Sequence, residues 1–312
     1  MEEWYIEPEL SMLPSSEGKI ELQTIFSKQE YRQSKKNNLK KCILITPGAF
    51  HNAELMKDLQ YRIFQSFKKR FPNHQIIVHT FSQLGHGKSE LKGCLHLKSF
   101  NTHVNVLEEI IQIVGNEIIL IGHSLGGLVI EKYLEKNRAL AVALLAPFNH
   151  SIHFKKDVIK HLLRHQKRTI LYYIFTWSPK RSFTPTAFKK LFYSAECDSQ
   201  EYNNRVEGIF EKISDESLRC FMGAFLTRLD YRKISRTPII IIGGEKDVAV
   251  QRQGLELLGK KLSSNVHMIP NATHNTLIND KTLGIEPKQG HVREVAENIA
   301  KFVHEIENVK EI

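Results

Sequence analysis

The feature that most constrains this 312-residue chain is the stretch 118–127, in which an apolar run stops at Gly-x-Ser-x-Gly. A helical pattern follows at once, so the stretch is typical of a strand, a tight turn and a helix. Such a turn forces Ser124 into a strained backbone conformation and aims its hydroxyl out above the sheet edge. Gly122 and Gly126 fit the turn because a side chain at either position would collide with the neighbouring strand or helix. A serine hydroxyl alone is a poor nucleophile, so the chain must also supply a base and an acid.

An acid and a base follow in the chain order expected for such a turn. Asp247 comes shortly after the apolar run 238–242, and His274 comes shortly after the apolar stretch 266–270. Both side chains therefore lie just past a predicted strand end, where short loops can bring a carboxylate to an imidazole. In this interpretation His274 accepts the proton of Ser124, while Asp247 orients the imidazole and stabilises its charged form.

Each of these residues also has a simpler explanation. The Gly-x-Ser-x-Gly pattern occurs by chance, Asp247 could cap a helix, and His274 is one of 15 histidines. His291 could compete as the base, but no strand directly precedes it. Because Ser124, Asp247 and His274 occur in the expected order, a catalytic triad explains the three residues together.

Two further stretches carry a family resemblance. Residues 43–51 read Ile-Leu-Ile-Thr-Pro-Gly-Ala-Phe-His, and residues 78–89 end in Gly-His-Gly-Lys-Ser. With the Ser124 turn, they make the chain resemble an α/β-hydrolase, and within that fold the serine aminopeptidase-like group that includes monoglyceride lipases and lysophospholipases. The resemblance covers about residues 40–148 and about residues 236–305.

The resemblance implies the α/β-hydrolase fold: a mostly parallel central sheet with helices on both faces and a helical cap inserted after strand 6 of that fold, here residues 139–146. The alternation of strand and helix patterns along the chain agrees with this α/β class. Residues 1–148 and 237–312 are expected to form the core, and residues 149–236 the cap. The expected strands are 19–26, 41–46, 75–80, 117–121, 139–146, 238–242 and 265–269, and the expected helices are 53–69, 101–114, 124–137, 250–262 and 291–306.

The same resemblance indicates an oxyanion hole, in which two backbone N–H groups meet the negative charge that develops on the acyl oxygen. Leu125 supplies the first N–H, because it follows the nucleophile at a helix N-terminus. By position in the family motif Ala49 supplies the second, and Phe50 is the next candidate. The chain departs from the family at this loop, since Pro47 stands where His is usual and Phe50 stands where Gly is common.

The insertion 149–236 carries most of the chain's formal net charge of +10, with seventeen Lys and Arg residues against nine Asp and Glu residues. Its basic stretch 155–168 also contains aliphatic residues and precedes the aromatic run 171–177. This pattern suits peripheral contact with an anionic membrane surface, and equally a solvated cap whose apolar side covers an acyl pocket. Nucleic acid is not an expected partner, because no recognition motif accompanies the charge.

A small acyl ester or lipid is the expected substrate, because the insertion is rich in aromatic and aliphatic side chains. The residues expected to line the substrate pocket are Phe50, His123, Phe148, Phe175 and Trp177. His123 lies inside the Gly-x-Ser-x-Gly turn, where the residue type varies freely, so a purely structural role for it is also open.

Composition argues against several other classes of protein. The four cysteines are scattered, and the chain has neither a Cys/His spacing typical of metal sites nor a Gly-rich phosphate loop, so we expect no metal and no cofactor. No apolar run approaches the roughly 18 residues of a membrane span. The acidic N-terminus shows no signal peptide, so we expect a cytoplasmic protein, with its oligomeric state left open.

These patterns together predict a serine hydrolase that cleaves carboxylic esters of apolar acyl chains through an acyl-enzyme, as esterases, lipases and lysophospholipases do. The same triad would serve a thioesterase, an amidase or peptidase, or an acyltransferase, because it activates the nucleophile and says little about the leaving group. A non-catalytic binding protein with a hydrolase fold is a further alternative, although such proteins usually lose a member of the triad.

Overall fold

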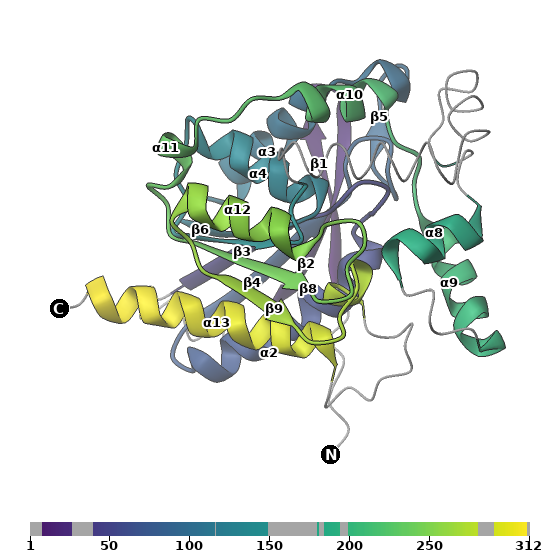
Figure 1. Ribbon diagram of the computed structural model, residues 1–312. Helices are drawn as coiled ribbons and strands as arrows, with labels where there is room; N and C mark the ends of the chain where they lie inside the picture. Colours follow the sequence, from purple (N-terminus) through teal and green to yellow (C-terminus); the bar gives the residue numbers. More distant parts are fainter. Residues whose placement is uncertain are drawn as a thin grey trace.

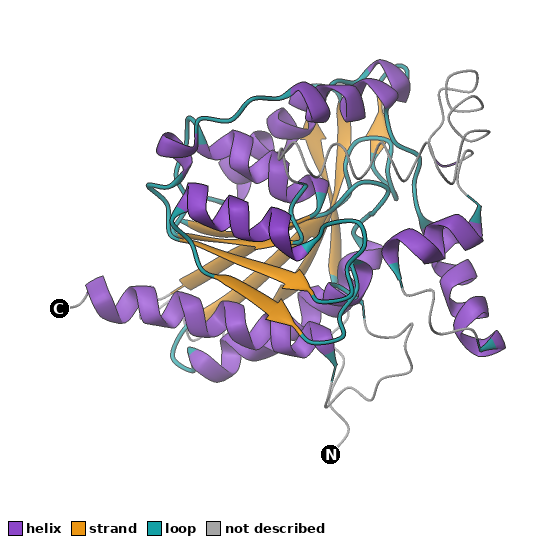
Figure 2. Ribbon diagram, viewed as in Figure 1, coloured by secondary structure: helices purple, strands orange, loops and turns teal. Residues whose placement is uncertain are grey.

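The computed structural model describes residues 8–26, 40–115, 117–148, 180, 184–193, 199–279 and 290–310. Within these ranges, an open sheet of nine strands lies between two layers of helices (Figures 1 and 2). The strands are β1 Glu9–Ser15, β2 Gly18–Phe26, β3 Lys40–Thr46, β4 Gln75–Phe81, β5 Glu90–Leu91, β6 Ile118–His123, β7 Ala141–Leu145, β8 Ile239–Gly244 and β9 Val266–Ile269. They are arranged in the order β1-β2-β4-β3-β6-β7-β8-β9, and β5 pairs with β2.

The central strands are parallel, and helices cover them on both faces. Strands β3, β4, β6, β7, β8 and β9 pair in parallel, whereas β2 pairs antiparallel with β1, β4 and β5. Every residue of β6, β7 and β8 is buried. Nearly continuous aliphatic sequences of this kind are typical of parallel strands with helices on both sides. The carboxyl ends of these strands meet at one edge of the sheet, where such folds place their sites.

Two groups of helices form the outer layers (Figure 1). Helices α2 (Lys57–Arg70) and α13 (His291–Lys310) pack against each other on one face of the sheet. Helices α3 (Phe100–Val114), α4 (Leu125–Leu134) and α12 (Arg252–Leu262) lie on the other face. Apolar residues recur at helical spacing along α13, and six of them are buried: Val292, Val295, Ala296, Ile299, Ala300 and Val303. None of the helices in the described ranges has the length and hydropathy that a membrane span requires.

The described helices between β7 and β8 belong to two different apolar clusters. Helices α8 (Pro185–Phe192) and α9 (Gln200–Lys212) form a small cluster with the loop after β3. Helices α10 (Leu218–Leu226) and α11 (Tyr231–Ile234) instead contribute buried residues to the main core. The members of the small cluster are Phe50, Leu55, Phe188, Phe192, Tyr193, Tyr202, Val206 and Ile213.

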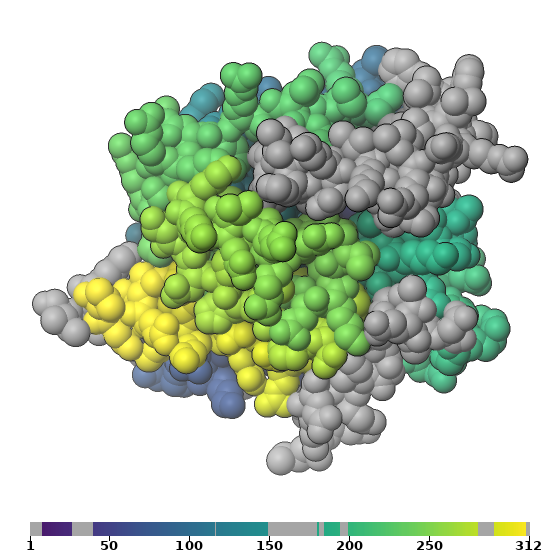
Figure 3. Space-filling model, viewed as in Figure 1, coloured from purple at the N-terminus to yellow at the C-terminus, as the bar shows by residue number. Residues whose placement is uncertain are grey.

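Helices α8 and α9 lie beyond the carboxyl ends of strands β8 and β9 (Figure 1). In the space-filling view, their teal surface lies on the right side of the molecule, and the yellow surface of α13 lies on the left (Figure 3). The basic stretch 155–168 and the aromatic run 171–177 fall outside the described residues. The extent of the cap, 149–236, and its contact with membrane therefore stay predictions.

The predicted fold class is confirmed, and the predicted strands and helices of the core all occur in the structure with small shifts at their ends. The helix expected at 53–69 begins with a 3₁₀ turn at Glu54–Met56 before α2. Strand β1 was not predicted. It pairs only with β2, most of its residues are exposed, and it contains Pro14, so it lacks the alternating apolar pattern by which a half-buried strand is recognised.

Candidate active site

The turn at Ser124 has a strained backbone that its surroundings hold in place. Strand β6 ends at His123 and α4 begins at Leu125, so Ser124 alone forms the turn. Its φ of 50° and ψ of −117° lie in a region that residues with a side chain rarely adopt. The Ser124 N–H donates to the Leu145 carbonyl at 2.9 Å, and the Ser124 carbonyl accepts from the N–H of Phe148 at 2.9 Å. The end of β7 therefore fixes the turn.

Close backbone contacts explain the two glycines of the turn. A Cβ on Gly122 would lie 2.7 Å from the Cα of Gly127. A Cβ on Gly126 would lie 2.3 Å from the carbonyl oxygen of Thr46, at the end of β3. Neither neighbour can swing aside, because both are backbone atoms. The turn consequently requires glycine at both positions for reasons of space.

Asp247 and His274 form a buried hydrogen-bonded pair. The His274 Nδ1 lies 2.8 Å from Asp247 Oδ2, and the two side chains are 1% and 0% exposed. The other carboxylate oxygen, Oδ1, accepts from the N–H groups of Ala249 and Val250, each at 2.8 Å. An ionised carboxylate only accepts, so Nδ1 carries the proton of this hydrogen bond. The pair therefore leaves Nε2 of His274 as the nitrogen that can take up a proton.

The loop that carries His274 packs against the Ser124 turn. Nε2 of His123 donates to the His274 carbonyl at 3.1 Å, and the two imidazole rings lie 4.7 Å apart between centroids. Burial, together with the neighbouring His274 and His51, lowers the pKa of His123 well below its usual value, so His123 is neutral. Nε2 of His274 is buried and has no hydrogen-bond partner among the described residues. The structure thus brings the Asp247–His274 pair to the residue next to Ser124, without a hydrogen bond from the Ser124 hydroxyl to His274.

The loop after β3 crosses directly over the Ser124 turn. A Cβ on Gly48 would lie 3.1 Å from Cβ of Ser124. The N–H of His51 donates to the Gly48 carbonyl at 3.2 Å, and Phe50 within this turn has a φ of 66°. Ala49 therefore lies on a tight loop next to Ser124, as the oxyanion-hole prediction requires. Leu125 is the first residue of α4, so its N–H has no partner within the helix. Their roles as oxyanion donors stay a prediction.

His51 positions this loop, and the sequence did not single it out. Its side chain is buried, and Nδ1 lies 2.7 Å from the Ala49 carbonyl oxygen. Burial lowers the pKa of His51 to about 4, so the neutral ring donates to that carbonyl at neutral pH. The His51 ring also meets the His123 ring edge-on, at 5.4 Å between centroids. Only its place two residues after Ala49 in the loop could have indicated this role.

Three of the predicted pocket residues are described, and all three are buried. Phe50 contacts the Phe221 ring at 5.5 Å between centroids, and Phe148 contacts the Phe225 ring at 5.0 Å. Both partners lie on α10, so this helix carries aromatic side chains to either side of the Ser124 turn. His123 is the third. The remaining two candidates, Phe175 and Trp177, lie outside the described residues.

The sequence matches a known family over more than half of its length. The family model described as serine aminopeptidase, S33, matches residues 59–282, a range that includes the Ser124 turn, Asp247 and His274. No curated protein matches the sequence.

Solved structures share the fold at low sequence identity. A structure from Nitrososphaera gargenis, from work on carboxylesterases, superposes with a TM-score of 0.67 and 14% identity over 97% of this chain and 100% of that chain. A membrane phospholipase A described as a bacterial virulence factor superposes with a TM-score of 0.64 and 14% identity, over 97% of this chain and 87% of that chain. The carboxylesterase CesB from Bacillus subtilis superposes with a TM-score of 0.62 and 14% identity, over 96% of this chain and 93% of that chain. The family match, together with this fold and the strained turn, shows that the chain belongs to the serine aminopeptidase S33 family of α/β-hydrolases.

Proposed function

We propose that this protein hydrolyses carboxylic esters of apolar acyl chains through a covalent acyl-enzyme. The observation that carries the proposal is the buried 2.8 Å hydrogen bond between Asp247 and His274, on a loop that packs against the strained Ser124 turn. An imidazole held in one tautomer by a carboxylate is what a serine nucleophile needs as its base. The printed names of the structural neighbours, which include carboxylesterases and a phospholipase, support the same class of reaction.

Ester hydrolysis would proceed in two steps, the formation of an acyl-enzyme at Ser124 and its hydrolysis. The Ser124 hydroxyl attacks the acyl carbon while Nε2 of His274 takes its proton. The N–H groups of Ala49 and Leu125 stabilise the negative charge on the acyl oxygen, and the leaving alcohol then receives the proton from His274. Water attacks the acyl-enzyme with His274 again acting as the base. The carboxylic acid departs and Ser124 regains its proton.

The aromatic rings around this site favour an apolar acyl group. The Phe192 ring lies 5.4 Å from the His274 ring, between centroids, so an aromatic side chain borders the base directly. Phe221 and Phe225 reach the neighbourhood of the turn from α10 through their contacts with Phe50 and Phe148. Burial of an alkyl chain against such rings contributes about 0.8 kcal/mol per methylene group. A charged acyl group would instead lose its hydration there.

A fluorophosphonate probe and a panel of substrates test the proposal. The probe should label Ser124, and labelling should disappear in Ser124→Ala but persist in Ser235→Ala, at an exposed serine that follows the last residue of α11. The substrate panel should contain acyl esters of increasing chain length, acyl-CoA thioesters and aminoacyl amides. We expect the highest kcat/KM for esters with medium or long chains. Preferred turnover of the thioesters or amides would overturn the ester assignment, and absence of labelling would overturn the serine mechanism.

A further inference from the structure

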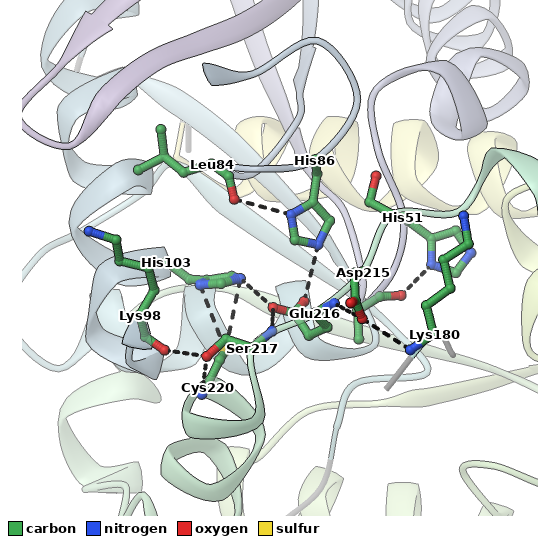
Figure 4. A network of polar contacts seen from close by, with 12 residues as sticks. His51, Leu84, His86, Lys98, His103, Lys180, Asp215, Glu216, Ser217 and Cys220 are labelled. Atoms are coloured by element: carbon green, nitrogen blue, oxygen red, sulfur yellow. Dashed lines mark hydrogen bonds and ion pairs between the residues drawn. The ribbon is translucent and has the colours of Figure 1, made fainter. Parts of the chain in front are cut away.

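Four metal-ligating side chains meet where α10 joins the core (Figure 4). His86 comes from the loop after β4, His103 from the first turn of α3, Glu216 from the residue before the N-cap of α10, and Cys220 from α10 itself. All four are buried, with exposed fractions of 1%, 4%, 1% and 0% respectively. None of them takes part in the proposed ester hydrolysis. A buried group of two imidazoles, a carboxylate and a thiol therefore needs its own explanation.

The carboxylate of Glu216 lies between the two imidazoles. Its Oε1 is 3.4 Å from Nε2 of His103, and its Oε2 is 3.4 Å from Nε2 of His86. The thiol of Cys220 lies on the other side of His103, with Sγ 3.7 Å from Nδ1 and 3.8 Å from Nε2. The ligand atoms of His103, Glu216 and Cys220 all lie within 4.8 Å of one another.

The contacts inside the cluster are long for charge-assisted hydrogen bonds. An imidazolium and a carboxylate approach to about 2.7–2.9 Å when they form one, whereas both nitrogen–oxygen contacts of Glu216 are ion pairs of 3.4 Å. Two ligand atoms that share a tetrahedral zinc ion, each about 2.0–2.3 Å from the metal, lie roughly 3.3–3.8 Å apart. The distances from His103 to Glu216 and to Cys220 therefore also fit a shared ion.

We propose that His103, Glu216 and Cys220 bind one zinc ion, which ties α10 to the core, while His86 holds the carboxylate of Glu216 through the ion pair on its other oxygen. A thiolate, an imidazole and a carboxylate together select Zn²⁺ among the common biological cations. Cys220 would release its proton to solvent on binding, and the charges of thiolate and carboxylate would balance the 2+ charge of the ion. Three protein ligands leave the fourth tetrahedral position to a water molecule.

Further contacts hold the carboxylate of Glu216 in place for such an ion. The Ser217 N–H donates to Oε1 of Glu216 at 2.9 Å. Nδ1 of His86 donates to the Leu84 carbonyl oxygen at 3.2 Å, and Nε2 of the same ring lies 3.4 Å from Oε2 of Glu216. Partners that fix a ligating carboxylate in this way are typical of metal sites.

The zinc site would also act on the proposed active site, a consequence that rests on the proposed function. Ser214 lies two residues before Glu216, and its N–H donates to the Phe50 carbonyl at 2.8 Å. Its hydroxyl accepts from the N–H of Gly87, next to His86, at 3.0 Å. One ion would therefore fix the segment that holds both the oxyanion loop and the aromatic residues of α10. We expect metal removal to raise KM for long acyl chains more than it lowers kcat.

Metal binding itself can be tested without any measurement of activity. The full-length protein is treated with a chelator, dialysed and titrated with Zn²⁺ and, separately, with Co²⁺. We expect one Zn²⁺ per chain, a rise in Tm on binding, and a thiolate-to-metal charge-transfer absorption in the Co²⁺ form. Cys220→Ser should remove that absorption and weaken Zn²⁺ binding on the order of 100-fold or more. Cys42→Ser is the matched control, because Cys42 is also buried but lies in β3, away from the cluster.

His103→Gln and Glu216→Gln extend the test if Cys220→Ser fails to fold, and each should weaken Zn²⁺ binding while the Cys42→Ser control does not. A chain that retains no Zn²⁺, or that binds it equally well without Cys220, His103 or Glu216, would overturn the zinc site. Because these readouts use metal content, absorption and Tm, failure of the zinc site leaves the ester-hydrolase proposal standing, and the reverse also holds.

Discussion

At the scale of single residues, the role of Asp247 depends on both of its oxygens. Oδ1 is held by two backbone N–H groups, so Oδ2 is fixed where Nδ1 of His274 can donate to it. Replacement by Asn keeps the shape but presents an amide that can itself donate to Nδ1. The imidazole would then favour the tautomer with its proton on Nε2, and could not accept the proton of Ser124.

Asp247→Asn should therefore lower kcat by about 10³- to 10⁴-fold with little change in Tm. Steady-state kinetics and a thermal melt measure the two quantities. Asp230→Asn is the control, because Asn can still cap α11 as Asp230 does. A variant at Asp247 with kcat within tenfold of the parent protein would argue against the assigned acid.

Glu131 offers a second test at this scale, on stability instead of activity. It lies on α4 and is buried, and its Oε1 has no hydrogen-bond partner among the described residues. Burial raises its pKa to about 8, against an opposing effect of Lys261. In the folded protein Glu131 therefore stays protonated above pH 4.5, the ordinary pKa of glutamate, whereas in the unfolded chain it loses its proton there. Stability is highest below that value and falls as the pH rises toward 8, by roughly 1 kcal/mol per pH unit at the steepest.

Glu131→Gln should remove this dependence. We expect its Tm to be close to that of the parent protein at pH 5 and above it at pH 8, because the amide never ionises. Thermal melts at the two pH values measure the difference, and Glu256→Gln, at an exposed position of α12, should change neither. Equal shifts in Tm at both pH values would contradict a raised pKa for Glu131.

At the scale of elements, the Ser124 turn depends on how closely β3 approaches α4. The backbone carbonyls of Thr46 and Pro47 lie 2.3 and 2.5 Å from the place that a Cβ on Gly126 would take. Gly126→Ala must push β3 and α4 apart. It should therefore lower the free energy of unfolding by roughly 1–3 kcal/mol or more, as overpacking of a protein core does.

Gly208→Ala is the matched control, since α9 leaves nothing within 4 Å of its Cβ. This substitution should stabilise the protein by about 0.5–1 kcal/mol, because alanine is the better helix former. Urea denaturation of the two variants gives both free energies of unfolding. If Gly126→Ala were as stable as Gly208→Ala, the close approach of β3 to α4 would be disproved.

Local patterns explain which elements the sequence could predict. Strands β6 and β8 are continuous aliphatic runs that stop at glycine, so the ends that position Ser124 and Asp247 were visible in the sequence. Strand β1 was not, because its residues are mostly exposed and its existence depends on pairing with β2. The contribution of α10 and α11 to the main core was also hidden, since an amphipathic helix does not reveal which apolar surface it will cover.

At the scale of the whole molecule, residues far apart in the sequence come into contact in ways that their spacing along the chain does not predict. The triad candidates follow a known order and could be named in advance, whereas the proposed zinc ligands could not. His103, Glu216 and Cys220 belong to no recognisable metal motif, and only the folding of α10 onto α3 brings them together. The same folding places Ser214 against Phe50. The core therefore carries the proposed chemistry, and the helices after β7 connect it to the residues that are proposed to surround the acyl group.

The most direct test of the account is the mass of the protein during turnover. The enzyme is mixed with a p-nitrophenyl ester of a medium-chain acid, quenched in acid within the first turnover, and digested for peptide mass spectrometry. We predict that the peptide containing Ser124 gains the mass of one acyl group, and that Ser124→Ala gains none and does not turn over the ester. Hydrolysis with no adduct at Ser124, or undiminished hydrolysis by Ser124→Ala, would contradict the proposed acyl-enzyme.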